Sequence, residues 1–225
     1  MDTEELTKGH RERLRERFAK NTNSAHDYEL LELLLFNASA RTDMKPMAKE
    51  LMHKFKNFTN LFEANIDDLI NIRGIGMSAA VLIRVLKEIL VRMNKTKLDN
   101  KHVLKNLSLV VDYLRILIGH SKIEKLAILF VNTKYTLIDT EVIDHGTVDK
   151  IAIYIRELIK KAIEKNAYGI ILSHNHPSQD ITPSIPDITF TEELNYACNS
   201  MSIKLIDHII IGSYAYYSFK ENSVL

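Results

Sequence analysis

Two histidines that directly follow a short apolar run constrain this chain more than any other feature. The run, residues 168–173, is β-rich and is predicted to form a buried strand. Side chains two residues apart on a strand point to the same face, so His174 and His176 can offer two imidazoles to one ion. Ser184 and Asp187 are three residues apart at the expected start of a helix, hence on one side of its first turn.

These residues predict a catalytic type of zinc site. Asp187 would add a carboxylate oxygen to the two imidazoles and leave the fourth position of a tetrahedral zinc ion open for water, which separates catalytic from structural sites. A lone His-x-His pair on a strand is more often a polar surface pair, and Ser184 with Asp187 could form an ordinary helix cap. The cap and the ligand role are compatible, and all four residues in register favour a metal site.

Length and composition exclude several classes of protein. The 225 residues can form one large domain or two small ones, and a net charge of +1 neither requires nor excludes a nucleic-acid partner. The single cysteine, Cys198, excludes an internal disulfide, fits a reducing compartment and is expected to be buried and inert. No signal peptide is visible, and no apolar stretch approaches the roughly 20 residues of a membrane span. We therefore expect a soluble, cytoplasmic protein without membrane contact.

The hydrophobic pattern divides the chain into two parts. Residues 1–95 predict a small all-helical N-terminal domain, and the polar residues 96–101 predict a linker. Residues 102–225 mix helices and strands, which predicts an α/β sandwich of two or three layers. In this second part we expect helices at about 104–119, 149–165 and 185–200, and strands at about 125–132, 135–143, 168–174, 203–211 and 214–219.

Hydrolysis at such a site also needs a group that takes a proton from water. Zinc lowers the pKa of a bound water toward about 7, and a carboxylate on a strand beside the metal strand can then act as general base. Glu141 fits this role, with Asp139 and Asp144 as rivals. Asp139 lies two residues from Glu141 and should face the same way, so spacing alone does not choose between them.

At these positions the chain resembles the JAMM signature of JAB/MPN+ metalloproteases, in which a distant glutamate precedes His-x-His-x7-Ser-x2-Asp. Longer segments are similar to the RadC family, namely residues 146–149, 174–178, 182–184 and 205–212, together with Thr191. The resemblance covers residues 102–225 well and the helical part more loosely. It implies an α/β (α+β) fold, a JAB/MPN-like, cytidine-deaminase-like sandwich that carries a metal-dependent hydrolase site.

The resemblance also implies a role for each matching residue. Zinc would be bound by His174, His176 and Asp187. Glu141 would be the general acid/base, and Ser184 would donate a hydrogen bond to water or to the oxyanion. The reaction would be the hydrolysis of an amide or isopeptide bond in a peptide or protein substrate.

Three residues near the signature need separate interpretation. Gln179 stands where RadC-like chains usually carry glycine, which would change the loop over the metal and substrate access. Asp207 and His208 are expected to form a structural pair at a strand end. A role behind a metal ligand, orienting its imidazole, is the alternative.

The helical part contains residues 71–80, which resemble a helix-hairpin-helix element. Gly74 and Gly76 would let the turn approach another backbone, the following helix presents free amides that suit a phosphate, and Arg73 is a nearby cation. Functional hairpins often carry a lysine or arginine after the second glycine, whereas this chain has Met77. We weigh DNA binding here equally against a tight turn that only packs two helices.

Residues 8–20 carry six cations and two acids, a net charge of +4. Such a segment could follow phosphates, but its alternating charges favour a solvated helix face. The alternative to a hydrolase is therefore a DNA-associated protein, related to DNA repair or mobile elements, whose metal domain is a nuclease or a scaffold.

Overall fold

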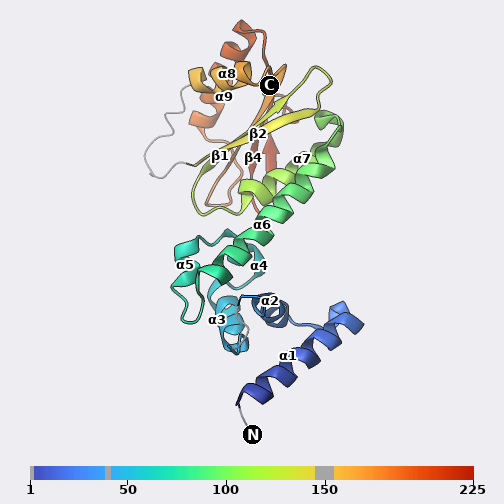
Figure 1. Cartoon of the computed structure of the whole chain (residues 1–225). Coiled ribbons are helices and arrows are strands. Elements are labelled where there is room, and N and C mark those ends of the chain that lie inside the picture. Colours follow the sequence, from blue (N-terminus) through green and yellow to red (C-terminus); the bar gives the residue numbers. More distant parts are fainter. Residues whose placement is uncertain (1–2, 39–41, 145–154) are drawn as a thin grey trace. The chain divides into compact units, whose positions relative to one another are not determined.

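The computed structural model describes residues 3–38, 42–144 and 155–225, and the chain divides into two compact units between Ile89 and Leu90. Figure 1 traces the elements of both units along the chain. Each unit has hydrophobic clusters of its own. The predicted order, a helical region followed by an α+β domain, is confirmed.

The first unit is built from helices and turns, and its described residues contain no strand. A core of almost fully buried leucines holds these helices together, among them Leu31, Leu51 and Leu69. The helices are α1 (Thr3–Lys20), the short η1 (Thr22–Ser24), α2 (Asp27–Leu35), α3 (Lys45–Phe55), α4 (Phe58–Glu63), α5 (Ile66–Ile70) and the first part of α6 (Met77–Leu98).

The predicted linker at residues 96–101 needs correction, because α6 runs into it and ends at Leu98. Residues 90–97 contain neither glycine nor proline and consist largely of good helix formers, so nothing in them stops the helix. Leu98 is fully buried in a cluster of the second unit. The boundary between the units therefore falls inside a helix, and polarity alone did not mark it.

The second unit contains a mixed sheet whose described strands follow the order β2-β1-β3-β4-β5. All neighbouring pairs are antiparallel except β3 and β4, which are parallel and connected through α9 (Ile185–Ser200). A parallel pair needs such a crossover. The strands are β1 (Lys125–Val131), β2 (Leu137–Asp144), β3 (Gly169–Asn175), β4 (Lys204–Ile211) and β5 (Tyr216–Ser218).

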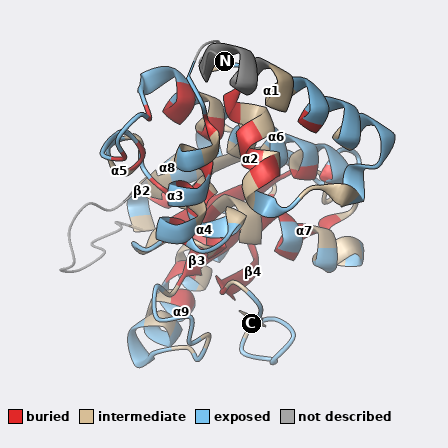
Figure 2. Ribbon diagram, turned by 90° about the horizontal axis from the view of Figure 1, so that it is seen from below, coloured by how far each residue is buried: buried red, intermediate tan, exposed pale blue. Residues whose placement is uncertain are grey.

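Helices cover both faces of this sheet, which makes three layers. On one face α8 (Ile155–Glu164) and α9 pack on Ile128, Leu172 and their neighbours. On the other face α7 (Leu107–Leu114) and the π-helical turn that follows it pack on Leu129, Ile171 and their neighbours. Figure 2 shows β3 and β4 as buried and the outer helix surfaces as exposed. The predicted start of α8, residues 149–154, lies outside the described residues.

Strand β4 carries one extra residue where it pairs with β3. Ile170 lies opposite Leu205 and Ile171 opposite Asp207, so Ile206 has no partner in the ladder. Such a bulge reverses the alternation of the side chains that follow. Gly169 accommodates it, because a Cβ there would lie 2.9 Å from the Ile206 side chain and 2.7 Å from the Lys204 carbonyl oxygen. After the bulge, His208 lies opposite Leu172 and shares the face of His174.

Candidate metal centre

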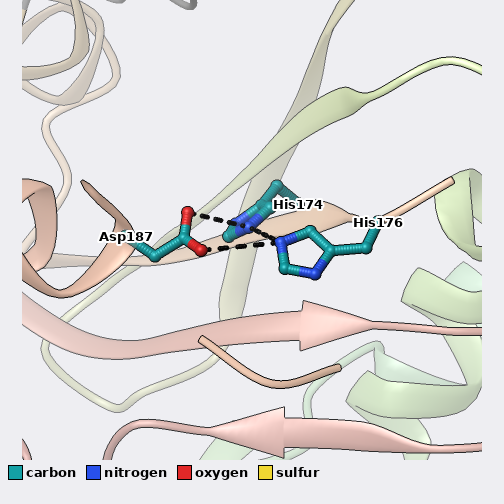
Figure 3. Close-up of side chains that lie close together, drawn as sticks. All are labelled: His174, His176 and Asp187. Carbon is teal, nitrogen blue, oxygen red and sulfur yellow. Dashed lines mark hydrogen bonds and ion pairs between the residues drawn. The ribbon is translucent and has the colours of Figure 1, made fainter. Parts of the chain in front are cut away.

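The two histidines and the aspartate predicted as zinc ligands lie together at the end of β3. His174 is the sixth residue of β3, and His176 follows the strand directly. Asp187 comes from the first turn of α9, which packs on the same face of the sheet. Figure 3 shows the three side chains turned toward one another. The structure thus brings together residues that the sequence separates by up to thirteen positions.

The distances within this triad suit one small cation. The Nε2 atoms of His174 and His176 lie 3.0 Å apart, and they lie 3.3 Å and 3.5 Å from the two carboxylate oxygens of Asp187. A tetrahedral zinc ion with bonds of about 2.0–2.1 Å places its ligand atoms about 3.3 Å from one another. The donor set, two imidazoles and a carboxylate, is also one that catalytic zinc sites use. The residues present therefore fit zinc. Among the described residues, this is the group found with metal-ligand spacing.

The loop after β3 fixes the orientation of His176. Its Nδ1 lies 2.5 Å from the carbonyl oxygen of Asp180, and its own carbonyl accepts a hydrogen bond from the backbone N–H of Gln179 at 2.9 Å. A carbonyl can only accept, so Nδ1 carries the proton of the neutral ring. Nε2 then presents a lone pair toward the triad, as a metal ligand must.

Ser184 caps α9 and also holds Asp187. The Ser184 backbone N–H and hydroxyl donate to one Asp187 carboxylate oxygen at 2.8 Å and 2.6 Å, and the Asp187 backbone N–H donates to the hydroxyl at 3.2 Å. These bonds form the capping box that the spacing of Ser184 and Asp187 predicts. The cap leaves the other carboxylate oxygen, Oδ1, facing His174, so the two roles are compatible.

Electrostatics favour a charged Asp187 and a basic His176. Burial by itself would raise the pKa of Asp187, but its close contacts with His174, His176 and Ser184 outweigh that effect and hold the pKa well below its usual range. The same contact with Asp187 raises the pKa of His176 against the effect of burial. The site therefore holds one full negative charge, which a cation would neutralise.

Glu141, the predicted general base, shares the sheet face of His174 but lies on β2. Glu141 and Leu172 both pair with Ile128 of β1, so β1 separates the glutamate from β3 by two strand spacings, about 10 Å. Its carboxylate contacts Lys161 at 2.5 Å and Lys165 at 3.4 Å. The rival Asp139 contacts Lys165 at 2.7 Å.

Sequence reasoning missed these two lysines, Lys161 in α8 and Lys165 directly after it. Their four-residue spacing on a helix was the available signal, because it places both ammonium groups on one face. The side chain of the second rival, Asp144, lies outside the described part of the structure, as do residues 146–149 of the resemblance.

We expect Glu141 to titrate below the ordinary range of glutamate, because the Lys161 ammonium lowers its pKa more than burial raises it. This ion pair then stabilises the fold above the pKa of an unfolded-state glutamate, and the effect is lost as pH falls through the lower folded pKa. Partial exposure limits the contribution to less than about 1 kcal/mol. Lys161→Met should raise the pKa of Glu141 in a carboxyl-detected NMR titration.

Lys160→Met is the matched control for that titration, since Lys160 contacts Glu164 at 3.9 Å instead. An unchanged pKa of Glu141 in Lys161→Met would contradict the expectation.

Behind the triad lies a second polar layer that the sequence suggested only in part. His208 is 1% exposed, and its Nε2 lies 2.8 Å from Nδ1 of His174. Asp207 points to the other face, where it accepts from the Ser218 hydroxyl at 2.6 Å and the Lys220 backbone N–H at 3.1 Å. The expected Asp207–His208 pair is thus two separate contacts, because neighbours on a strand face opposite sides.

Gln179 shows why glycine is usual at its position in RadC-like chains. Its φ is +66°, the left-handed region that costs other residues about 1–2 kcal/mol. Its side chain offsets part of that cost, because Oε1 accepts a hydrogen bond from the Ser213 backbone N–H at 2.6 Å. The strain of a non-glycine residue at position 179 is therefore partly offset by this hydrogen bond, and the Gln179 backbone N–H still donates to the His176 carbonyl.

We expect Gln179→Ala to lower the free energy of unfolding by about 1 kcal/mol, because it keeps the strained backbone and loses this hydrogen bond. Gln179→Gly loses the same bond but relieves the strain, so its stability should lie above that of the alanine variant by about 1 kcal/mol. Thermal unfolding of the three proteins measures the difference. A glycine variant less stable than the alanine variant would show that position 179 is unstrained.

The turn predicted to bind DNA is exposed in the first unit. Gly74 adopts φ +88°, the left-handed region that glycine favours, and Arg73 and Gly76 are also exposed. Ile72 and Ile75 of the same turn are buried in the helical core. The turn therefore does pack helices, and its phosphate-binding role stays a prediction.

The cationic segment 8–20 lies in α1, where Leu14 is buried and Arg13, Arg15 and Lys20 are exposed. Arg17 contacts Glu29 at 2.6 Å, an ion pair within the unit. This arrangement agrees with the favoured interpretation of a solvated helix face.

Cys198 is fully buried in α9, as expected, and burial raises the pKa of its thiol to about 11. A protonated, buried thiol does not act as a ligand or nucleophile.

None of the helices in the described residues combines the length and the apolar character that crossing a bilayer requires.

Three layers around a mixed sheet, with two histidines and an aspartate gathered at the end of a central strand, are the arrangement of a JAB-type domain. Comparison with family models agrees: residues 104–224 match the RadC-like JAB domain, and residues 8–81 match the UPF0758 N-terminal domain. The chain belongs to the RadC family.

Two relatives match the chain over nearly its whole length. A UPF0758 protein of Fusobacterium nucleatum subsp. nucleatum is 39% identical over 231 residues, which cover 99% of this chain and 100% of the relative. A UPF0758 protein of Ruegeria pomeroyi is 36% identical over 217 residues, 96% of this chain and 97% of the relative. The similarity thus extends over the helical unit as well as the JAB domain.

Proposed function

We propose that this chain is a zinc-dependent hydrolase that cleaves a peptide or isopeptide bond. The observation that carries the proposal is the triad, in which two imidazole nitrogens and a carboxylate lie 3.0–3.5 Å from one another. Membership of a family with a JAB domain supports the same chemistry. A zinc ion held there would polarise the scissile carbonyl and lower the pKa of a water molecule.

The chain's own residues have separate tasks in this reaction. His174, His176 and Asp187 hold the metal, and Asp187 is itself kept charged and oriented by Ser184. The Ser184 hydroxyl is exposed, and to donate to the oxyanion that forms as the carbonyl is attacked it must turn its proton away from Asp187, which keeps the hydrogen bond from the Ser184 backbone N–H. Glu141 would take a proton from water and return it to the leaving amine, for which its carboxylate must release Lys161.

The experiment that tests the proposal compares zinc content and cleavage in purified full-length protein. The wild type should hold about one zinc per chain and cut members of a peptide library or an isopeptide-linked substrate. The double variant His174→Ala/His176→Ala should do neither. His53→Ala is the matched control, because His53 is an exposed histidine of α3. A wild type that holds no zinc, or cleavage that persists in the double variant, would refute the proposal.

A second candidate function is DNA binding by the helical unit, favoured by the exposed Gly74 turn with Arg73 and Gly76 beside the start of α6. In this case the metal domain would be a nuclease or a scaffold. Phosphate contacts make affinity fall steeply with salt. Salt-dependent binding of labelled DNA that survives His174→Ala and is weakened by Arg73→Ala would support it. Equal binding by wild type and Arg73→Ala would count against this turn.

A further inference from the structure

A line of polar side chains extends from His174 into the core, away from the triad. Nδ1 of His174 contacts Nε2 of His208 at 2.8 Å, and Nδ1 of His208 contacts the hydroxyl of Thr191 at 2.6 Å. The Thr191 hydroxyl donates to the backbone carbonyl of Asp187 at 2.6 Å. His174, His208 and Thr191 are 3%, 1% and 1% exposed, so solvent takes no part in these contacts.

The direction of every hydrogen bond in this line follows from its last member. A carbonyl oxygen can only accept, so the single hydroxyl proton of Thr191 is committed to Asp187. Toward His208 the threonine oxygen must then accept, which places a proton on Nδ1 of His208. A neutral imidazole has one N–H, so Nε2 of His208 is bare and accepts from Nδ1 of His174. Nε2 of His174 is in turn left with a lone pair that faces the triad.

The opposite protonation would spoil the metal site. A doubly protonated His208 would donate to Nδ1 of His174 and force the proton of that ring onto Nε2, which faces His176 and Asp187. The direct contacts of His208 offer no negative charge: its ring stacks on Phe219 at a centroid distance of 4.8 Å, and its partners are a hydroxyl and an imidazole. An unpaired charge buried in this way is costly.

The fold places Thr191 on the helix that supplies a ligand and His208 on the strand next to the other two ligands. Thr191 lies four residues after Asp187 on α9, so one helix positions the carboxylate and the hydroxyl. His208 reaches the face of His174 because of the bulge at Ile206. The line of hydrogen bonds that begins at His174 therefore ends at Asp187, because Thr191 donates to the Asp187 backbone carbonyl and the Asp187 side chain is the third ligand.

We propose that Thr191 and His208 are positioning residues that set the tautomer of His174, so that its Nε2 is free for the metal before the metal arrives. This inference rests on the proposed function in one respect, that the triad binds zinc. It goes further because it traces the position of the proton on each ring to the hydroxyl of Thr191, which touches neither metal nor substrate.

The test uses two measurements on the full-length protein. The first is the ¹⁵N spectrum of the histidine rings in metal-free protein, which distinguishes a protonated Nδ1 from a protonated Nε2. We expect His174 and His208 to be protonated at Nδ1 in the wild type and in Thr191→Ser, and His174 to show a mixture of tautomers in Thr191→Val. The second is zinc affinity by competition with a chelator. It should fall by about 10- to 100-fold in Thr191→Val and stay near the wild-type value in Thr191→Ser.

The outcomes separate the inference from the proposed function. A wild-type His174 protonated at Nε2 overturns the inference without the need for any variant, so a misfolded variant cannot hide the answer. Zinc affinity that is equal in wild type and Thr191→Val also overturns it, while the hydrolase proposal stands. Wild-type protein with the expected tautomers but no zinc affinity would refute the hydrolase proposal, while the assignment of the ring protons to Nδ1 of His174 and His208 would stand.

Discussion

Replacing Asp187 with asparagine is expected to remove zinc from the purified protein and leave its fold intact. The amide keeps the size of the carboxylate and one oxygen that can accept from the Ser184 backbone N–H, so the cap of α9 is preserved. It loses the negative charge that lies 3.3 Å and 3.5 Å from the two imidazoles. We expect zinc affinity to fall by more than about 100-fold, since even partners behind a ligand contribute 10- to 100-fold.

Asp180→Asn is the matched control for this variant. Asp180 lies in the same loop region, and its side chain accepts from the Thr182 backbone N–H at 2.9 Å rather than facing the triad. Elemental analysis after dialysis and circular dichroism give the two readouts. Wild-type zinc content in Asp187→Asn, with an unchanged spectrum, would mean that the carboxylate is no ligand.

Glu141→Gln is expected to lower the turnover of a peptide substrate by about 10²- to 10⁴-fold while zinc content stays at one per chain. The amide cannot take a proton. The substitution should not disturb the triad, because β1 lies between β2, which carries residue 141, and β3. Asp139→Asn is the rival variant on the same strand face and should leave turnover within a few-fold of the wild type. Both side chains contact Lys165, Asp139 at 2.7 Å and Glu141 at 3.4 Å.

Turnover that survives Glu141→Gln and disappears in Asp139→Asn would assign the role of general base to Asp139.

The pH dependence of turnover is an independent measurement. A carboxylate held by Lys161 has a lowered pKa and is a weak base, whereas an effective general base has a pKa near the working pH. Lys161→Met should therefore move the acidic limb of the profile upward in a protein where Glu141 is the base.

The triad was predictable from sequence because it depends on local rules. Side chains two apart on a strand and residues in the first turn of a helix have fixed directions, so the common direction of His174 and His176 and the place of Asp187 in its helix were predictable. The strands and α9 were predictable for the same reason, since their apolar runs and their cap are local signals. The JAB-type fold followed from the resemblance at these positions.

The parts that sequence did not predict depend on long-range packing. The contacts of Glu141 with Lys161 join two elements that are separated by residues outside the described structure. The separation of Asp207 from His208 requires the register of β4 against β3, which no spacing within β4 reveals. The helical linker was missed because polar residues can form either a solvated helix or a loop, and the burial of Leu98 decides between them.

The unpaired Ile206 has an effect on chemistry that its apolar side chain does not suggest. Were it to slip into the ladder opposite Ile171, Asp207 would stand opposite Leu172 and turn an acid, instead of a ring nitrogen, toward His174. His174, which now faces one carboxylate, that of Asp187, would then lie beside two. Backbone pairing thus decides which side chain lies behind His174. Gly169 makes room for the bulge that places His208 there instead of an acid.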